Sequence, residues 1–128
     1  MRKAWVVGVA LFASAPTYAA DWVRLTDGSA ELPAVHYDRE SVQRTGAVVS
    51  VWVRYVYSPN TRQVIQEALD QREYDCARRL TRILFVVEYN AARQLLHNGP
   101  TGNASFRPVV PDSAGELVYR TLCSQYSN

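Results

Sequence analysis

The most strand-like stretch of this sequence is residues 47–57, which read AVVSVWVRYVY. β-Branched and aromatic residues favour strands, and the Ser-Pro-Asn sequence at 58–60 is typical of a turn. Because side chains alternate between the two faces of a strand, every second residue shares a face. We expect one face to be buried, and it consists of Val49, Val51, Val53, Tyr55 and Tyr57.

The opposite face of this strand carries Trp52 and Arg54 between smaller side chains. We expect this face to be wetter, since a sheet in a small domain is commonly covered on one side only. Tryptophan and arginine are enriched among residues that dominate protein interfaces. Trp52 and Arg54 are therefore candidate partner-binding residues.

The segment before this strand predicts two shorter strands, at residues 22–25 and 35–38. Turns are expected at 27–29, which contains Asp-Gly-Ser, and at 38–41. Residues 44–46, Arg-Thr-Gly, are expected to form a hairpin loop that leads into the long strand.

The segment after this strand is harder to assign. Residues 61–71 fit either a helical face or an extended strand. Residues 72–89 predict a long strand, and its broken alternation indicates a β-bulge. Residues 93–96 are expected to return as a hairpin partner, and 98–103, rich in Asn and Gly, to form an exposed loop.

A helix is predicted over residues 114–123. Ser113 and Glu116 have the spacing of a capping box, in which the serine side chain accepts a hydrogen bond from the glutamate amide. The apolar residues of this helix give a broad face that can lie on a sheet. The fold class is therefore α+β, a small antiparallel sheet with a C-terminal helix packed on one face.

The first twenty residues have the pattern of an export signal. Arg2 and Lys3 precede a twelve-residue apolar run, and small residues follow it. The run is too short for a membrane-spanning helix, which needs roughly 20 residues. We expect cleavage after Ala19, or alternatively after Ala20, so that residues 1–19 are a signal peptide and 20–128 form one domain.

Cys76 and Cys123 are the two cysteines of the chain. In an exported protein an even count indicates a disulfide, and here one pairing is available. A metal site is not expected, because His36 and His97 are isolated and no CxxC or HxxxH spacing occurs. No cofactor is predicted. With no cysteine near the cleavage point, we also do not expect a lipid anchor.

The charge balance excludes one class of partner. Removal of Arg2 and Lys3 with the signal leaves twelve basic and twelve acidic side chains. A neutral domain gives no electrostatic reason to bind nucleic acid. All twelve cations are arginines, which suit planar contacts with carboxylates, although a biased genome composition also produces this preference.

Catalysis is not predicted. His36 and Asp38 share a strand face, yet the sequence ties no nucleophile to them, and we interpret them as a surface polar pair. Carboxylates gather at Glu67, Asp70, Glu73 and Asp75 without the pattern of a calcium loop, and a surface laced with ion pairs explains them.

Arg78, Arg79 and Arg82 form the densest basic cluster. Arg78 and Arg82 are further candidates for partner binding, which would be sensitive to salt. The alternative, which we favour, is pairing within the chain to Glu73, Asp75 or Glu88. Asp75 is expected to need such a partner, for example Arg79.

The mature chain also resembles the surface-adhesin protein E family. The signal followed by Trp22, the Val51-Trp52-Val53-Arg54 strand, the Tyr74-Asp75-Cys76 element and the final Cys123 have the order and spacing of that family. So do Tyr37-Asp38 with Ser41, Arg78-Arg79, Tyr89 and Pro111-Asp112-Ser113. The resemblance implies a small antiparallel sheet tied to a C-terminal helix by the disulfide.

The resemblance also implies an adhesin that binds host matrix and plasma proteins such as vitronectin, laminin and plasminogen. The family includes a lipoprotein, from which this sequence departs because it has no cysteine at the cleavage site. Two hypotheses follow. The protein binds a host partner through the face around Trp52 and Arg54 or the loop at 98–103, or it is a soluble periplasmic accessory or inhibitor-like domain. No pattern in the sequence indicates an oligomeric state.

Overall fold

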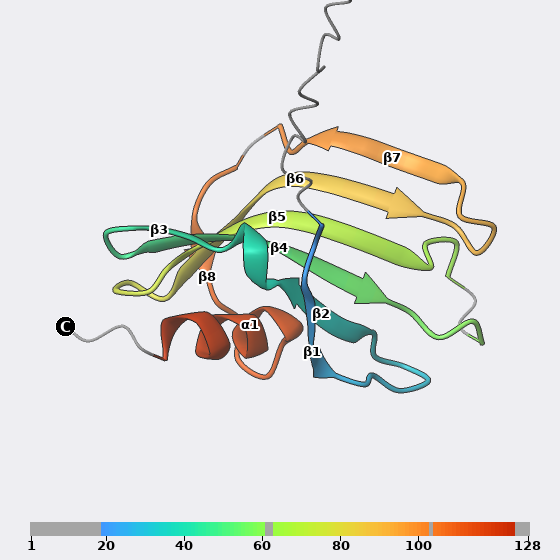
Figure 1. The fold of residues 1–128 in the computed structure, drawn as a ribbon, viewed down its shortest axis with the longest axis horizontal. Coiled ribbons are helices and arrows are strands. Elements are labelled where there is room, and N and C mark those ends of the chain that lie inside the picture. The colour runs from blue at the N-terminus through green and yellow to red at the C-terminus, as the bar shows by residue number, and fades with distance from the viewer. Residues whose placement is uncertain (1–18, 61–62, 103, 125–128) are drawn as a thin grey trace, which may run out of the picture.

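The computed structural model describes residues 19–60, 63–102 and 104–124. Within these residues, one antiparallel sheet of eight strands carries a single α-helix on one face (Figure 1). The expected signal peptide lies outside the described residues except for Ala19. The elements in chain order are β1 (Trp22–Thr26), β2 (Ala34–Asp38), the 3-10 helix η1 (Arg39–Ser41), β3 (Gln43–Thr45), β4 (Val48–Val56), β5 (Glu67–Asp75), β6 (Leu80–Tyr89), β7 (Leu95–Pro100), β8 (Arg107–Pro108) and α1 (Ala114–Cys123).

The strand order is β1-β2-β4-β5-β6-β7, so β4 and β5 lie at the centre. The short strands β3 and β8 continue the lines of β2 and β7, because β3 pairs with the start of β4 and β8 with the start of β6. Ser41 closes the gap between β2 and β3: its hydroxyl accepts a hydrogen bond from the Trp52 amide at 2.9 Å. An antiparallel sheet with one C-terminal helix is the predicted α+β class, which is confirmed.

The alternation predicted for 47–57 is confirmed in β4. Val49, Val51, Val53 and Tyr55 are buried, whereas the residues between them are half-buried. The buried residues pack with Val35 of β2, Tyr74 of β5, Val109, and three residues of α1, namely Val118, Tyr119 and Leu122. The helix therefore covers the face of the sheet that the sequence marks as apolar.

The C-terminal helix has the predicted bounds and the predicted cap. The Ser113 hydroxyl accepts a hydrogen bond from the Glu116 amide at 3.1 Å. The Glu116 carboxylate is buried, and it forms ion pairs with Arg120 at 2.9 Å and with Arg79 at 3.2 Å. A buried carboxylate at the first helical turn is favourable here because it has cationic partners and faces the positive end of the helix dipole.

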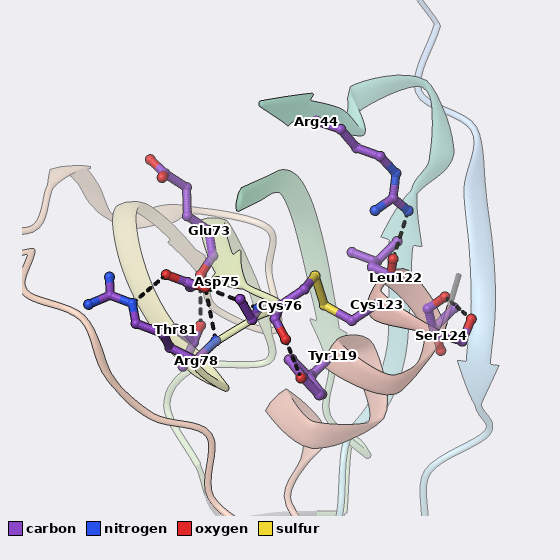
Figure 2. The surroundings of a disulfide bond; sticks show 12 residues. Arg44, Glu73, Asp75, Cys76, Arg78, Thr81, Tyr119, Leu122, Cys123 and Ser124 are labelled. Atoms are coloured by element: carbon purple, nitrogen blue, oxygen red, sulfur yellow. Dashed lines mark hydrogen bonds and ion pairs between the residues drawn. A yellow bond between two sulfur atoms is a disulfide. The ribbon is translucent and has the colours of Figure 1, made fainter. Parts of the chain in front are cut away.

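The predicted disulfide joins Cys76 and Cys123, whose Cα atoms are 5.5 Å apart (Figure 2). Two hydrogen bonds support the same contact. The Tyr119 hydroxyl donates to the Cys76 carbonyl at 2.9 Å, and Arg44 Nη2 donates to the Leu122 carbonyl at 2.7 Å. The end of the helix is thus attached both to the turn after β5 and to strand β3.

Several local predictions were wrong. Residues 72–89 are not one strand, because 76–79 form a tight turn between β5 and β6. The expected bulge does occur, at Leu84 of β6, which has no partner in β5. For residues 61–71 the sequence allows a helix or a strand, and positions 67–71 are strand, since they pair with both β4 and β6. Positions 61 and 62 lie outside the described residues.

Two predicted loops are partly strand. Arg44 and Thr45, expected in a hairpin loop, belong to β3, and the turn lies at 46–47, where Gly46 has a φ of 60°. Asn98, Gly99 and Pro100, expected in an exposed loop, pair with Val87, Val86 and Phe85. In both cases pairing with a neighbouring strand satisfies the backbone of a segment whose residues favour turns.

We expect the disulfide to contribute much of the stability of this fold. It closes a loop of 47 residues, which corresponds to about 4 kcal/mol in the chain-entropy model. The double variant Cys76→Ser/Cys123→Ser should lose roughly this free energy of unfolding in urea titrations. Wild-type protein with reductant should match the variant. A loss of less than about 1 kcal/mol in both would contradict this contribution of the disulfide.

Candidate functional site

The face of the sheet opposite α1 is the principal candidate for an interaction surface. The strand registers place Trp52, Gln71 and Phe85 in one row across β4, β5 and β6. The rings of Trp52 and Phe85 are 6.1 Å apart in an edge-to-face arrangement. Further half-buried apolar residues lie on this helix-free face; they include Val48, Val56, Leu69, Val87 and Tyr89. The centre of the helix-free face is therefore apolar and aromatic.

The bulge in β6 is the reason why Phe85 lies beside Trp52. Arg82 lies on the helix-free face and Ile83 on the other, because they pair with Glu73 and Arg72. Regular alternation would put Phe85 on the helix-covered face with Ile83. The unpaired Leu84 shifts the alternation by one residue, so Phe85 pairs with Gln71 and joins the helix-free face.

Ion pairs flank this apolar centre along the strands. At one end, Glu67 binds Arg54 at 3.0 Å and Arg93 at 3.3 Å. At the other end, Glu73 binds Arg82 at 3.2 Å. An apolar centre with a charged periphery is the usual anatomy of a protein interface.

Each of these three arginines also lies over an aromatic ring. The Arg82 guanidinium is 4.3 Å from the centre of the Phe106 ring, and Arg54 is 5.9 Å from that of Trp22. Arg93 lies 6.0 Å from the ring of Tyr89. These contacts hold the long side chains flat, so less conformational entropy is lost when a partner covers them.

The structure brings together three of the four predicted partner-binding residues. Trp52, Arg54 and Arg82 lie on the helix-free face, but Arg78 belongs to the turn at 76–79 at one end of the sheet. Sequence reasoning missed Phe85, Tyr89, Arg93 and Phe106. The arginines and carboxylates that pair on this face were visible in the sequence. The position of Phe85 beside Trp52 was not, because it depends on the bulge in β6.

The basic cluster pairs within the chain, as we favoured. Arg78 binds Asp75 and Arg82 binds Glu73, while Arg79 binds Glu116 rather than Asp75. The Asp75 carboxylate also accepts the amides of Ala77 at 3.1 Å and Arg78 at 3.0 Å (Figure 2). It therefore caps the turn that carries Cys76, and the bonds from Arg78 lower the pKa of its carboxyl.

His36 and Asp38 are buried, each with 9% of its surface exposed, so their interpretation as a surface pair was wrong. The Asp38 carboxylate accepts the amides of Asp21 and Glu40, whereas His36 Nε2 accepts from Arg24 at 3.4 Å. Burial, and then the charges of Arg54 and Arg24, lower the pKa of His36. The two side chains therefore bind different partners, and their hydrogen bonds hold the β1–β2 edge of the sheet.

The described residues contain no group of three or more His, Cys, Asp or Glu side chains placed to hold a metal ion. They also contain no helix that is long and apolar enough to cross a membrane.

Comparison with known proteins agrees with this architecture. The family model described as surface-adhesin protein E matches residues 22–124. Two solved structures of Haemophilus influenzae protein E are similar at 12% sequence identity. One covers 94% of this chain and 100% of its own with a TM-score of 0.58, and the other 88% and 92% with 0.55. No curated protein matches in sequence.

We expect Asp75 to stabilise the fold in a pH-dependent manner. Because its folded pKa is lowered, the stabilisation is present above the ordinary carboxyl pKa of 3.8 and is lost as the pH falls through the folded value. Asp75→Asn should reduce the free energy of unfolding by about 1 kcal/mol at pH 7. The difference from wild type should vanish towards pH 2, as followed by urea titration at each pH.

Asp27→Asn is the matched control, because Asp27 is exposed and pairs with the exposed Arg24. It should show no difference at any pH. A constant deficit of Asp75→Asn between pH 7 and pH 2 would mean that the charge of Asp75 does not stabilise the turn.

Proposed function

Because this chain belongs to the surface-adhesin protein E family, we propose that it is an exported, non-catalytic protein of the bacterial envelope that binds a protein partner. The signal pattern of residues 1–19 supports export, and the absence of a cysteine near the cleavage point supports a protein without a lipid anchor. If the protein reaches the cell surface, its partners are host matrix or plasma proteins.

The observation that carries the proposal is the helix-free face. Trp52 and Phe85 at its centre are half-buried, so part of their apolar surface is exposed to water. A partner that covers this surface gains free energy from the hydrophobic effect. The ion pairs of Glu67 and Glu73 bracket the centre on opposite sides. A partner that covers the centre leaves these charges at the rim, where they are already neutralised and still hydrated.

The charged rim also predicts what kind of contact the partner makes. Since Arg54, Arg82 and Arg93 already have carboxylate partners, they add little net charge to attract an acidic surface. The main gain comes from apolar and aromatic contact with Trp52 and Phe85. We therefore expect binding that weakens only modestly when salt is added.

Binding to immobilised vitronectin and laminin, measured by surface plasmon resonance, tests this function. Trp52→Ala and Phe85→Ala should each weaken binding about tenfold or more, because each removes a central aromatic. Leu32→Ala is the control, since Leu32 is 68% exposed but lies in the loop between β1 and β2. Retention of full affinity in both aromatic variants would place the contact elsewhere and refute this face.

Protease treatment of intact producing cells tests the location separately. We expect an antibody signal for the domain to disappear while a periplasmic control protein stays protected. Protection of the domain until the outer membrane is permeabilised would instead support the periplasmic accessory or inhibitor-like function. The partner should then be sought among envelope proteins.

A further inference from the structure

A pocket of about 540 Å³ opens on the helix-covered face of the sheet, beside the first turn of α1. Its floor comes from β4, β5 and β6. Its walls come from Gln63, Ile65, residues 108–110 and residues 113–115. The volume is in the range of pockets that bind small ligands. This pocket lies on the opposite side of the sheet from Trp52 and Phe85, so it is separate from the proposed partner surface.

The pocket floor has a gap built into the sheet. Tyr55 pairs with Ala68, and Ala68 pairs with Glu88, so the three residues form one row across β4, β5 and β6. Adjacent strands are about 4.8 Å apart, so the Cα atoms of Tyr55 and Glu88 are separated by about 10 Å. The methyl group of Ala68 leaves the space between these two larger side chains unfilled.

Glu88 is the exception among the carboxylates of the two long strands. On β5, all the carboxylates have an arginine partner, and they are Glu67, Asp70, Glu73 and Asp75. On β6, Glu88 has no ion pair or hydrogen bond within the described part of the chain, although it lines the pocket. Among the described residues, this carboxylate of the pocket therefore has no cationic partner.

The charge of Glu88 shifts the pKa values of two neighbouring groups, Asp70 and Tyr57. Burial raises the pKa of Asp70, and the charge of Glu88 raises it further against the opposing effect of Arg72. Burial likewise raises the pKa of the Tyr57 hydroxyl, with Asp70 and Glu88 adding to the shift. Asp70, Tyr57 and Glu88 are thus close enough to act on one site.

Tyr55 supplies an aromatic wall and an unused hydroxyl. It is 92% buried and lines the pocket, yet its hydroxyl has no hydrogen-bond partner among the described residues. Burial raises the pKa of Tyr55 strongly, so the hydroxyl stays protonated and its ring keeps a neutral face. A ring face of this kind attracts cations that lie within about 6 Å of its centre.

Among the described residues that line the pocket, Arg72 is the one cation, and its carboxylate partner is Asp70 rather than Glu88. The Cα atom of Arg72 lies about 13 Å from that of Ala68, four residues along β5. Its Nη2 atom binds the Asp70 carboxylate at 3.0 Å, and its charge also acts on the Tyr55 hydroxyl. Its guanidinium points to the first turn of α1, since Nη1 is 3.2 Å from where a side chain on Gly115 would begin. Arg72 therefore neutralises Asp70 and leaves Glu88 available.

We propose that this pocket binds an organic cation with a primary ammonium or guanidinium group, seated over Ala68 between the Tyr55 ring and the Glu88 carboxylate. Such a group matches the aromatic wall and the Glu88 carboxylate, which has no ion-pair partner among the described residues. A metal ion fits less well, because two carboxylates, one of them held by Arg72, are too few oxygen ligands for a divalent cation. The cation comes either from a free amine or from a lysine or arginine side chain of a peptide.

Titration of the purified, disulfide-bonded protein with n-butylammonium, followed by amide NMR shifts, tests the proposal. We expect saturable shifts at Ala68 and Glu88, and none with n-butanol, which has the same chain without the charge. Glu88→Gln should weaken binding about tenfold or more. Ala68→Val fills the gap and should abolish binding while keeping every charge.

Glu40→Gln is the matched control, because Glu40 is an exposed carboxylate in η1 far from the pocket; it should bind like wild type. Thermal melting separates binding from folding: Glu88→Gln removes an unpaired charge and should melt at or above the wild-type temperature. Equal binding by wild type and Glu88→Gln, or equal binding of butanol and butylammonium, would overturn the proposal.

A parallel titration with N-acetyl-lysine methylamide distinguishes the source of the cation. Binding of both probes with the same dependence on Glu88 supports recognition of a lysine side chain in a peptide. Binding of butylammonium alone supports a free amine. Both readings are independent of the vitronectin and laminin assays, because those depend on Trp52 and Phe85 on the other face.

Discussion

The attachment of α1 to the turn between β5 and β6 is the constraint on which the rest of the structure depends. A disulfide joins Cys76 of this turn to Cys123 at the end of the helix. Tyr119 adds a hydrogen bond to the Cys76 carbonyl, and Arg79 reaches from the same turn to Glu116. Because one short helix can cover only one side of the sheet, this attachment also determines which side stays open.

The two faces of the sheet handle charge differently. On the helix-free face, the described arginines are held by carboxylates and aromatic rings, so their charge is neutralised beside an apolar centre. On the covered face, Asp70 and Arg72 neutralise one another, whereas Glu88 lines an open pocket and has no partner among the described residues. The same strands therefore present two surfaces that suit different ligands.

Sequence reasoning was reliable where the signal was local. The alternation of β4 identified the buried valines, and Ser113 marked the start of the helix at the correct residue. It failed over residues 72–89, because the turn at 76–79 is made by the Asp75 side chain and contains neither Gly nor Pro. It also missed the contribution of Phe85, since alternation after Leu84 depends on how β6 pairs with β5.

The sequence by itself determined the apolar face of β4, the helix with its cap and the pairing of the two cysteines. These follow from periodicity, from residue spacing and from a count of two, all of which are properties of short segments or of the whole composition. Only the tertiary structure decided that Trp52 meets Phe85 and that Ala68 separates Tyr55 from Glu88. Those contacts depend on strand register and on one bulge, which are set by pairing between segments far apart in the chain.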